Sequence, residues 1–374
     1  MNLRTTLDSV AGIVLVGTHP WRNRAFDRLP LRPLIPIAHK PLISYSLAWL
    51  RDCGVQQVTV CANRETQALA THLLRHVPAG LAVSYQEDSM PRGAAGAVRD
   101  AVTASVANTF VVAEGTAIPN VDLQDLLDAH HASGAVATVV GYSAPGRDGN
   151  GDRRQIPSGI YVFNREALDA LPVRGFHDIK ENLLPQLYQS GQRVVAYAAN
   201  SANPRVLGAA SYLAANEWMV EQLVNNGDAP EGYVRFGSSL VHREASIAAT
   251  AVLVGPVLVA AGARVLSNAV VVGPTSIGCE ATVGRSVLVS RSAIWRRCVV
   301  GEHAVADRCI LADDTIVTPH AQAFGTVMAA HPRREPELSF RAAADVREPA
   351  SLDLLRKMGR ILVGGAWSRS PEAL

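Results

Sequence analysis

The chain has 374 residues and a net charge of +2, so it is long enough for two domains, and its scattered Lys and Arg argue against a nucleic-acid surface. The five Cys show no paired metal-ligand spacing, no apolar run approaches the ~20 residues that span a bilayer, and the N-terminus lacks the pattern of a signal peptide. We therefore expect a cytoplasmic protein with reduced thiols, no membrane span and no nucleic-acid partner.

The first 228 residues alternate short apolar runs with amphipathic stretches. Residues 11–16 form a continuous apolar run, which is typical of a buried parallel strand. The other expected elements, in chain order, are helix 39–53, strand 55–61, helix 65–76, strand 81–85, helix 93–106, strand 109–113, helix 122–133, strands 135–141 and 160–163, and helices 179–188 and 212–225. This alternation predicts an α/β domain over residues 1–228 with a doubly wound, mostly parallel sheet.

A second pattern begins near residue 229, where every sixth residue is aliphatic. No α-helix keeps one face with a period of six, whereas each coil of a left-handed parallel β-helix consists of three hexapeptides with one aliphatic side chain pointing inward. The sequence therefore predicts a β-helix over residues 229–330. The phase slips after position 289 and resumes at Ile294, Val300, Val305, Leu311 and Val317. The regular members are Val241, Ile247, Leu253, Val259, Val265, Val271, Ile277, Val283 and Val289.

The remaining residues, 331–374, form a polar C-terminal tail without hexads. Residues 351–363 are predicted to form a helix that caps the open end of the β-helix, because a solenoid must cover its last coil.

Several motifs of the first domain occur in a recognisable order. They are residues 13–17 (Ile-Val-Leu-Val-Gly), 31–43 (Leu-Arg-Pro-Leu-Ile-Pro-Ile-Ala-His-Lys-Pro-Leu-Ile), 91–97 (Pro-Arg-Gly-Ala-Ala-Gly-Ala), 122–138, and 158–163 (Ser-Gly-Ile-Tyr-Val-Phe). Together they resemble the sugar-1-phosphate nucleotidyltransferases, such as the mannose-1-phosphate guanylyltransferases, many of which carry a left-handed β-helix after a Rossmann-like domain. The resemblance covers residues 11 to about 320.

The resemblance implies a reaction in which a sugar 1-phosphate attacks a nucleoside triphosphate and releases pyrophosphate. Members of the family neutralise the two anionic reactants with an Arg, a Lys and a magnesium ion held by two Asp, and Gly-rich backbone contacts the nucleotide. In this chain Arg22 and Arg32 occupy the places of the Arg and the Lys. The positions that correspond to the nucleotide-contacting segments are Gly17, Gly93, Ala94, Gly96, Ser158 and Gly159.

The chain departs from the family at the metal. Thr116 and Val206 occupy the places of the two magnesium-binding Asp, so no metal ligand is predicted. Thr18 and Pro20 replace two loop glycines, and Pro lacks the N–H that a phosphate cradle needs. The segment after residue 141 is too short to contain the family's sugar-reading Glu-Lys-Pro. These losses predict weak or lost catalysis, with magnesium as a cofactor only if the protein is active.

Three functions remain open from the sequence. The first is a nucleotide-binding or regulatory subunit of nucleotide-sugar or polysaccharide metabolism, which binds a nucleoside triphosphate or nucleotide sugar and forms a homo-oligomer or pairs with a catalytic paralogue. The second is an active nucleotidyltransferase with a rebuilt metal site that uses Glu114, Asp148 or Asp152. The third is a β-helix acyltransferase in which His303 or His320 acts as general base.

Overall fold

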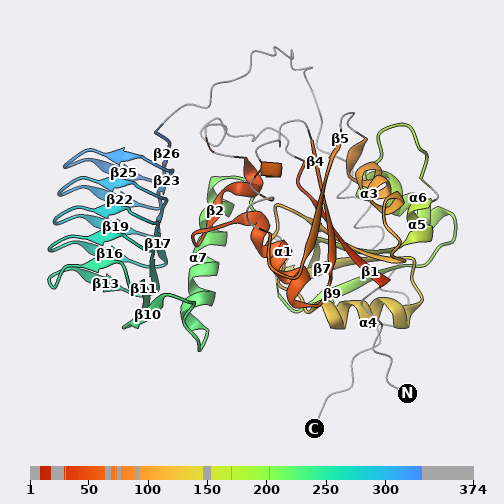
Figure 1. Ribbon diagram of the computed structural model, residues 1–374, viewed down its shortest axis with the longest axis horizontal. Coiled ribbons are helices and arrows are strands. Elements are labelled where there is room, and N and C mark those ends of the chain that lie inside the picture. The colour runs from red at the N-terminus through yellow and green to blue at the C-terminus, as the bar shows by residue number, and fades with distance from the viewer. Residues whose placement is uncertain are drawn as a thin grey trace, which may run out of the picture.

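The computed structural model describes residues 9–17, 29, 31–63, 69–71, 73, 77–88, 92–145, 153–169, 171–201 and 203–330. An α/β part and a β-helix lie side by side, and helix α7 (Ala209–Asn225) stands between them (Figure 1). The predicted fold class is therefore confirmed. The domain boundary predicted at residue 229 falls between α7 and the next strand, β10 (Tyr233–Phe236), and the exact bounds stay predictions.

The α/β part is built on a seven-stranded sheet with the order β5-β4-β1-β6-β8-β7-β9. Only β8 is antiparallel to its neighbours, so the sheet is mostly parallel, as expected. The strands are β1 (Val10–Leu15), β4 (Gln57–Asn63), β5 (Ala82–Asp88), β6 (Thr109–Glu114), β7 (Ala137–Pro145), β8 (Arg153–Asn164) and β9 (Val194–Ala199).

Helices cover both faces of this sheet. One apolar core joins the sheet to α1 and α4, and the other joins it to α3, α5 and α6. The sequence missed β9 and the short helix α5, and β7 and β8 extend beyond the strands predicted over 135–141 and 160–163. The helices and turns are η3 (Arg32–Leu34), α1 (Leu42–Asp52), α3 (Gly93–Thr103), α4 (Leu123–Ser133), α5 (Arg165–Asp169), the π-helical turn η5 (Ile179–Leu183) and α6 (Leu184–Gln189).

The β-helix has three parallel sheets, each adding one short strand per coil. The first sheet packs against α7 and contains β10, which is antiparallel to β11 (Ser239–His242), then β14 (Val257–Val259), β17 (Thr275–Ile277), β20 (Ala293–Ile294), β23 (Ile310–Leu311) and β26 (Val327–Met328). The second contains β12 (Ser246–Ile247), β15 (Arg264–Val265), β18 (Thr282–Val283), β21 (Val299–Val300) and β24 (Ile316–Val317). The third contains β13 (Val252–Val254), β16 (Val270–Val272), β19 (Leu288–Ser290), β22 (Val305–Asp307) and β25 (Gln322–Phe324).

The strand register confirms the slip of the hexads and corrects one of their positions. Val271 pairs with Val289, and Val289 pairs with Ala306, so the coil shortens from 18 residues (271 to 289) to 17 (289 to 306). Ala306 is fully buried whereas Val305 is partly exposed, so the inward position predicted at Val305 is wrong by one residue. The second short step lies between Ala306 and Leu311, one corner later than the sequence suggested.

A polar junction joins the two parts through α7. The hydroxyl of the fully buried Tyr212 donates to the carbonyl of Pro36 at 2.6 Å and accepts from the indole N–H of Trp295 at 2.7 Å. One turn along α7, the amide oxygen of Asn216 accepts the backbone N–H of Ala38 at 2.9 Å. The segment 36–41, α7 and the β-helix are therefore tied together by buried hydrogen bonds, and their apolar side chains share one core.

His39 lies at this junction and makes the stability of the fold depend on pH. Burial lowers the pKa of His39 to about 4, its Nε2 atom is buried, and Nδ1 lies 3.4 Å from the hydroxyl of Tyr233. Between pH 6.5 and 4 the unfolded chain binds a proton that the folded chain excludes, so the free energy of unfolding falls as the pH falls.

The wild type should lose stability between pH 7 and pH 4 because of His39. In His39→Asn we expect this loss in the free energy of unfolding to be smaller by about 2–3 kcal/mol. Asn tolerates the positive φ of 72° at this position. Urea denaturation at several pH values measures the difference, and His131→Asn, at an exposed position, is the matched control. Equal slopes for the wild type and His39→Asn would contradict the assignment.

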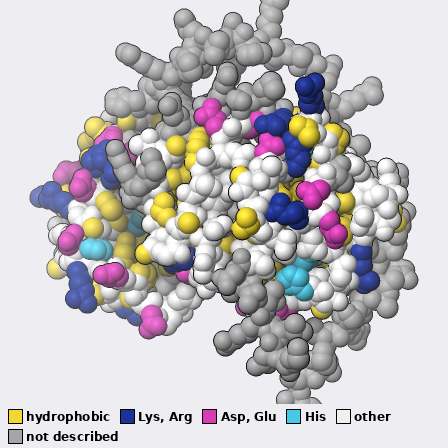
Figure 2. Space-filling view, turned by 45° about the vertical axis from the view of Figure 1, so that its right-hand side comes forward, with side chains coloured by type: hydrophobic (Ala, Val, Ile, Leu, Met, Phe, Trp, Pro, Cys, Tyr) yellow, Lys and Arg dark blue, Asp and Glu magenta, His cyan; other side chains and the backbone are white. Residues whose placement is uncertain are grey.

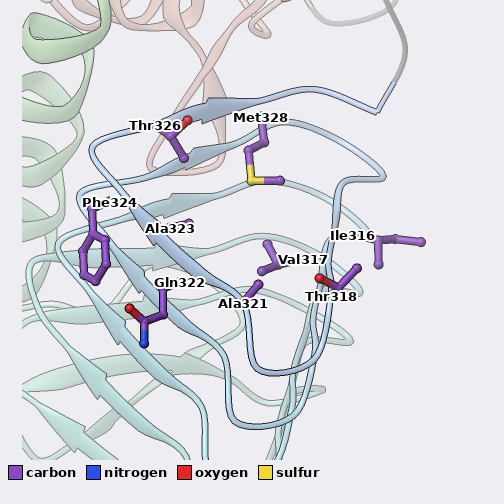
Figure 3. Close-up of a pocket in the computed structure, with 9 residues that line it drawn as sticks. All are labelled: Ile316, Val317, Thr318, Ala321, Gln322, Ala323, Phe324, Thr326 and Met328. Atoms are coloured by element: carbon purple, nitrogen blue, oxygen red, sulfur yellow. The ribbon is translucent and has the colours of Figure 1, made fainter.

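The last coil of the β-helix is open. A cavity of about 550 Å³ lies at this end, and the side chains of Val317, Ala321, Ala323 and Met328 border it (Figure 3). The helix predicted over 351–363 lies outside the described residues, so its role as a cap stays a prediction. Among the described residues, no helix is long and apolar enough to cross a membrane.

If the tail covers this end, a chain that stops at Ala330 should be less stable than the full chain. Covering a few apolar side chains contributes about 1–2 kcal/mol, which corresponds to a decrease of a few degrees in Tm. Differential scanning calorimetry of both chains makes the comparison. Identical melting curves would show that residues 331–374 do not cap the β-helix.

Candidate functional site

The candidate site lies where β1 and β6 end side by side at the carboxyl edge of the sheet. Ligands of open α/β sheets bind at this edge. The backbone N–H of Gly115, directly after β6, donates to the carbonyl of Leu15 at 2.8 Å. A Cβ atom on Gly115 would lie 2.7 Å from the side chain of Val16, so only glycine allows the two strand ends to approach this closely. This contact places Glu114 beside the start of the loop that follows β1.

Glu114, the last residue of β6, is held by three other side chains. Its Oε1 accepts from the ammonium group of Lys180 at 3.0 Å and from the hydroxyl of Tyr161 at 3.1 Å. Its Oε2 accepts from the guanidinium group of Arg205. Two cations therefore surround one carboxylate, and the four side chains form what we call the Glu114 cluster (Glu114, Tyr161, Lys180 and Arg205).

Backbone contacts fix the position of Arg205. The N–H of Val206 donates to the carbonyl of Thr116 at 2.7 Å, and the N–H of Ile118 donates to the carbonyl of Pro204 at 2.9 Å. Arg205 also forms an isolated antiparallel bridge with the residue after Thr116. The segment 204–206 thus runs alongside the segment that follows β6, and its one charged side chain points to Glu114.

Lys180 reaches the cluster from another segment of the chain than Arg205. It lies in the π-helical turn η5, whose N-cap Asp178 accepts the backbone N–H groups of Lys180 at 2.7 Å and of Glu181 at 3.1 Å. A side-chain cap of this kind satisfies the free amides at the start of the turn and fixes where the turn begins. Asp178 therefore positions Lys180 without contacting Glu114 itself.

The charges of the cluster control its protonation. Burial alone would raise the pKa of Glu114, but the attraction of Arg205 and Lys180 is stronger in sum, and the pKa of Glu114 is lowered. Burial raises the pKa of Tyr161 well above its ordinary value, and the negative charge of Glu114 raises it further. At neutral pH the cluster therefore contains an ionised carboxylate, two cations and a neutral phenol, with a net charge of about +1.

These residues do not fit a magnesium ion. Magnesium prefers several oxygen ligands, mainly carboxylates, in a near-octahedral arrangement. Both carboxylate oxygens of Glu114 are already bonded, Val206 is fully buried, and Thr116 offers only an uncharged hydroxyl. Across the described part of the chain, no three His, Cys, Asp or Glu side chains are grouped so that they could hold a metal ion.

The two Arg predicted as catalytic are only partly placed. Arg22 lies outside the described residues. Arg32 begins the short helical turn η3 and is partly buried, which lowers the pKa of its guanidinium group. Neither residue is among the partners of Glu114 that the described part of the structure shows, so their role stays a prediction.

The glycines predicted to contact nucleotide near residue 93 lie at the start of α3. Gly93 has a positive φ of 76°, and a Cβ atom there would lie 2.4 Å from the carbonyl oxygen of His177. That same carbonyl accepts the backbone N–H of Ala95 at 2.9 Å and the more distant N–H of Gly96 at 3.4 Å. Ala94 lies in the same first turn. The chain itself thus occupies amides that a phosphate would otherwise use.

The other predicted contacts divide into open and packed positions. Gly17 is exposed just after β1, and a Cβ atom added there would meet only open space. Ser158 is fully buried, and its hydroxyl donates to the carbonyl of Val140 at 3.0 Å. It therefore stabilises the contact between β8 and β7. Gly159 lies against Glu114, because a Cβ atom at Gly159 would come within 3.2 Å of that side chain.

Sequence reasoning gave no role to Tyr161, Lys180 and Arg205, although they form the charged centre of the site. The signal in the sequence was the presence of other charged residues near the places of the two lost metal ligands: Glu114 lies two residues before Thr116, and Arg205 lies directly before Val206. Such a set is recognisable as one cluster only when the fold brings the segments together.

The residues of the other two hypotheses lie elsewhere. Asp148 and Asp152 are outside the described residues. His303 and His320 stack in parallel with their ring centroids 5.0 Å apart on an exposed corner of the β-helix. The β-helix side of the molecule carries many charged side chains of both signs (Figure 2). Nearby corners carry ion pairs between successive coils, such as that of Arg297 with Asp314 at 2.6 Å.

Comparison with known proteins gives the same family as the motifs. Residues 12–152 match the model of the nucleotidyl transferase family. The chain is 22% identical over 276 residues to a mannose-1-phosphate guanylyltransferase of Mycobacterium tuberculosis, covering 68% of this chain and 76% of the relative. It is 24% identical over 223 residues to a UTP–glucose-1-phosphate uridylyltransferase of Synechocystis, covering 50% of this chain and 57% of the relative.

Among solved structures, HddC from Yersinia pseudotuberculosis aligns with a TM-score of 0.48 and 18% identity, covering 56% of this chain and 99% of that chain. The chain thus spans about three quarters of its first relative and little more than half of the second. The family match shows that residues 12–152 are a nucleotidyl transferase domain, and the relatives show that the chain is similar to the sugar-1-phosphate nucleotidyltransferases.

Proposed function

We propose that the chain binds a nucleoside triphosphate or a nucleotide sugar and has weak or no nucleotidyl-transfer activity, so that it serves nucleotide-sugar metabolism as a binding or regulatory subunit. The observation that carries this proposal is the Glu114 cluster. The carboxylate nearest to the family's metal position is bonded to Lys180 and Arg205. A carboxylate held in this way is not available to a divalent cation.

The chemistry of the reaction explains why this matters. A sugar phosphate oxygen must attack the α-phosphorus of a nucleoside triphosphate, and both reactants are anions. Aligning them and stabilising the charge of the transition state is most of what a phosphoryl-transfer site does, and a metal ion bridges the phosphate oxygens. Lys180 and Arg205 supply fixed positive charge and hydrogen bonds, which favour binding. Glu114 neutralises part of their charge, so less of it is available to stabilise the transition state.

A pyrophosphate-release assay tests this proposal. The full chain is incubated with magnesium, GTP, UTP or dTTP, and mannose 1-phosphate or glucose 1-phosphate. We expect the wild-type chain to release pyrophosphate no faster than a Glu114→Gln variant, which lacks the carboxylate nearest to the metal position. Magnesium-dependent release well above that rate, abolished by EDTA, would refute weak or lost catalysis.

The second candidate is an active nucleotide-sugar pyrophosphorylase, and the names of the relatives favour it. The two relatives compared above are a guanylyltransferase and a uridylyltransferase. In this case a rebuilt metal site would draw carboxylates from Asp148 or Asp152. Activity in the same assay that disappears in Asp148→Asn or Asp152→Asn would support this candidate over the first.

We also propose that the chain forms a homo-oligomer through its β-helix. The outer face of the third sheet carries exposed aliphatic and aromatic side chains at Val252, Val254, Leu288 and Phe324. An apolar row of this kind on an exposed surface is typical of an interface. Sedimentation velocity of the wild type and of Val254→Lys tests it. A monomeric wild type would contradict self-association and leave pairing with a catalytic paralogue as the remaining form of partnership.

A further inference from the structure

The Glu114 cluster has one positive charge more than its carboxylate neutralises. Lys180 has three N–H donors and uses one for Glu114, and its side chain is 29% exposed. The side chain of Arg205 is 22% exposed, and its buried Nε atom has no hydrogen-bond partner among the described residues. A polar atom of this kind is rarely left unpaired in a native protein unless a ligand or water satisfies it.

Arg205 is also reachable from a cavity. This cavity has a volume of about 350 Å³, and its wall also contains Ser201, Pro204 and, from helix α7, Ser211 and Trp218. This volume is within the range of small-molecule sites. Beside the cluster, the hydroxyl of Thr116 is buried and likewise lacks a partner among the described residues. Unused donors of Arg205, Lys180 and Thr116 therefore lie near the end of β6, at the carboxyl edge of the sheet.

Guanidinium and ammonium groups are the usual protein ligands of phosphate, and charge-assisted hydrogen bonds to phosphate oxygens are stronger than neutral ones. Glu114 keeps the two cations in place and cancels only one of their two positive charges. A magnesium ion at the same place would be repelled by both cations and would find only one carboxylate, already bonded. The site is thus arranged for an anion rather than for a metal complex of that anion.

We propose that Arg205 and Lys180 take the place of the divalent ion, so that the chain binds the phosphate groups of a nucleotide without metal. This inference rests on the proposed function, because it assumes that the carboxyl edge of the sheet is the nucleotide site. It adds that the ligand is recognised as free, uncomplexed polyphosphate.

Isothermal titration calorimetry tests the inference on the full chain. GTP, UTP, dTTP, GDP-mannose and inorganic pyrophosphate are titrated once with magnesium and once with EDTA. For the probe that binds most tightly, we expect the two Kd values to agree within about threefold. Arg205→Met should weaken binding in EDTA at least tenfold, or about 1.4 kcal/mol. Lys180→Met should act in the same direction, and Arg193→Met, which removes an exposed Arg, should have no effect.

The outcomes separate this inference from the proposed function. Binding that requires magnesium, without turnover, would overturn the inference and leave the proposed function intact. Magnesium-dependent pyrophosphate release would refute the proposed function whatever the Kd values are. Binding of pyrophosphate alone would support an anion site and locate its specificity in the phosphates. Absence of binding by all probes would overturn both. Circular dichroism spectra of each variant show whether a lost affinity reflects a lost fold.

Discussion

Tyr212→Phe is expected to lower the free energy of unfolding by about 2–4 kcal/mol. The substitution removes one oxygen atom, yet it leaves the carbonyl of the partly buried Pro36 and the buried indole N–H of Trp295 without this hydrogen-bond partner. Each buried group that loses its hydrogen bond costs about 1–3 kcal/mol. Because the three residues belong to different parts of the chain, we expect the effect to extend beyond α7.

Urea denaturation followed by circular dichroism and tryptophan fluorescence measures this effect. Tyr188→Phe is the matched control, since Tyr188 is 46% exposed, and its substitution should change stability by less than about 0.5 kcal/mol. If Tyr212→Phe is as stable as the wild type, the junction does not depend on these hydrogen bonds. If the two signals separate in the variant only, the junction couples the unfolding of the α/β part to that of the β-helix.

Glu114→Gln is expected to lower the stability of the fold without weakening the binding of pyrophosphate. The variant leaves Lys180 and Arg205 without their counter-charge, which should lower the free energy of unfolding by about 1–3 kcal/mol, less than for a fully buried pair because the side chains are partly exposed. The same change frees donors of both cations. Binding of pyrophosphate should therefore stay equal or become tighter, whereas the loss of a metal ligand would weaken it.

The pH dependence of Glu114→Gln gives an independent readout. The folded pKa of Glu114 lies below its unfolded value, so its ionised form stabilises the fold above about pH 4.3, and this contribution is lost as the pH falls through the folded pKa. The wild type should lose this stability in acid, and the variant should not have it at any pH. Glu231→Gln, at an exposed position, is the control. Parallel stability curves for Glu114→Gln and wild type would contradict the ion pairs.

The β-helix could be predicted closely from the sequence because its signal is local and repeated. One aliphatic residue in every six is enough to set the coil length, and the slip after Val289 was visible as well. The one error, Val305 in place of Ala306, arose because both residues are small and apolar, so the pattern could not show which one points inward. Strand β9 was missed because its side chains are only partly buried, which weakens the apolar signal of a strand.

The charged centre of the site could not be predicted in the same way. Lys180 and Arg205 lie 66 and 91 residues after Glu114. They meet it only because the fold brings the turn η5 and the segment 204–206 to the end of β6. The family pattern showed which carboxylates are absent. It could not show that a Glu and two cations had taken their place, since that arrangement depends on three-dimensional contacts.

The central claim is that the cations of the Glu114 cluster exclude a divalent ion from the site. Electron paramagnetic resonance of Mn²⁺, which loses its free-ion signal on binding, measures this directly on the full chain. We predict that wild-type protein leaves the free Mn²⁺ signal unchanged and that Arg205→Asp, which replaces a cation by a second carboxylate, reduces it. Uptake of one Mn²⁺ per wild-type chain, lost in Glu114→Gln, would contradict the account.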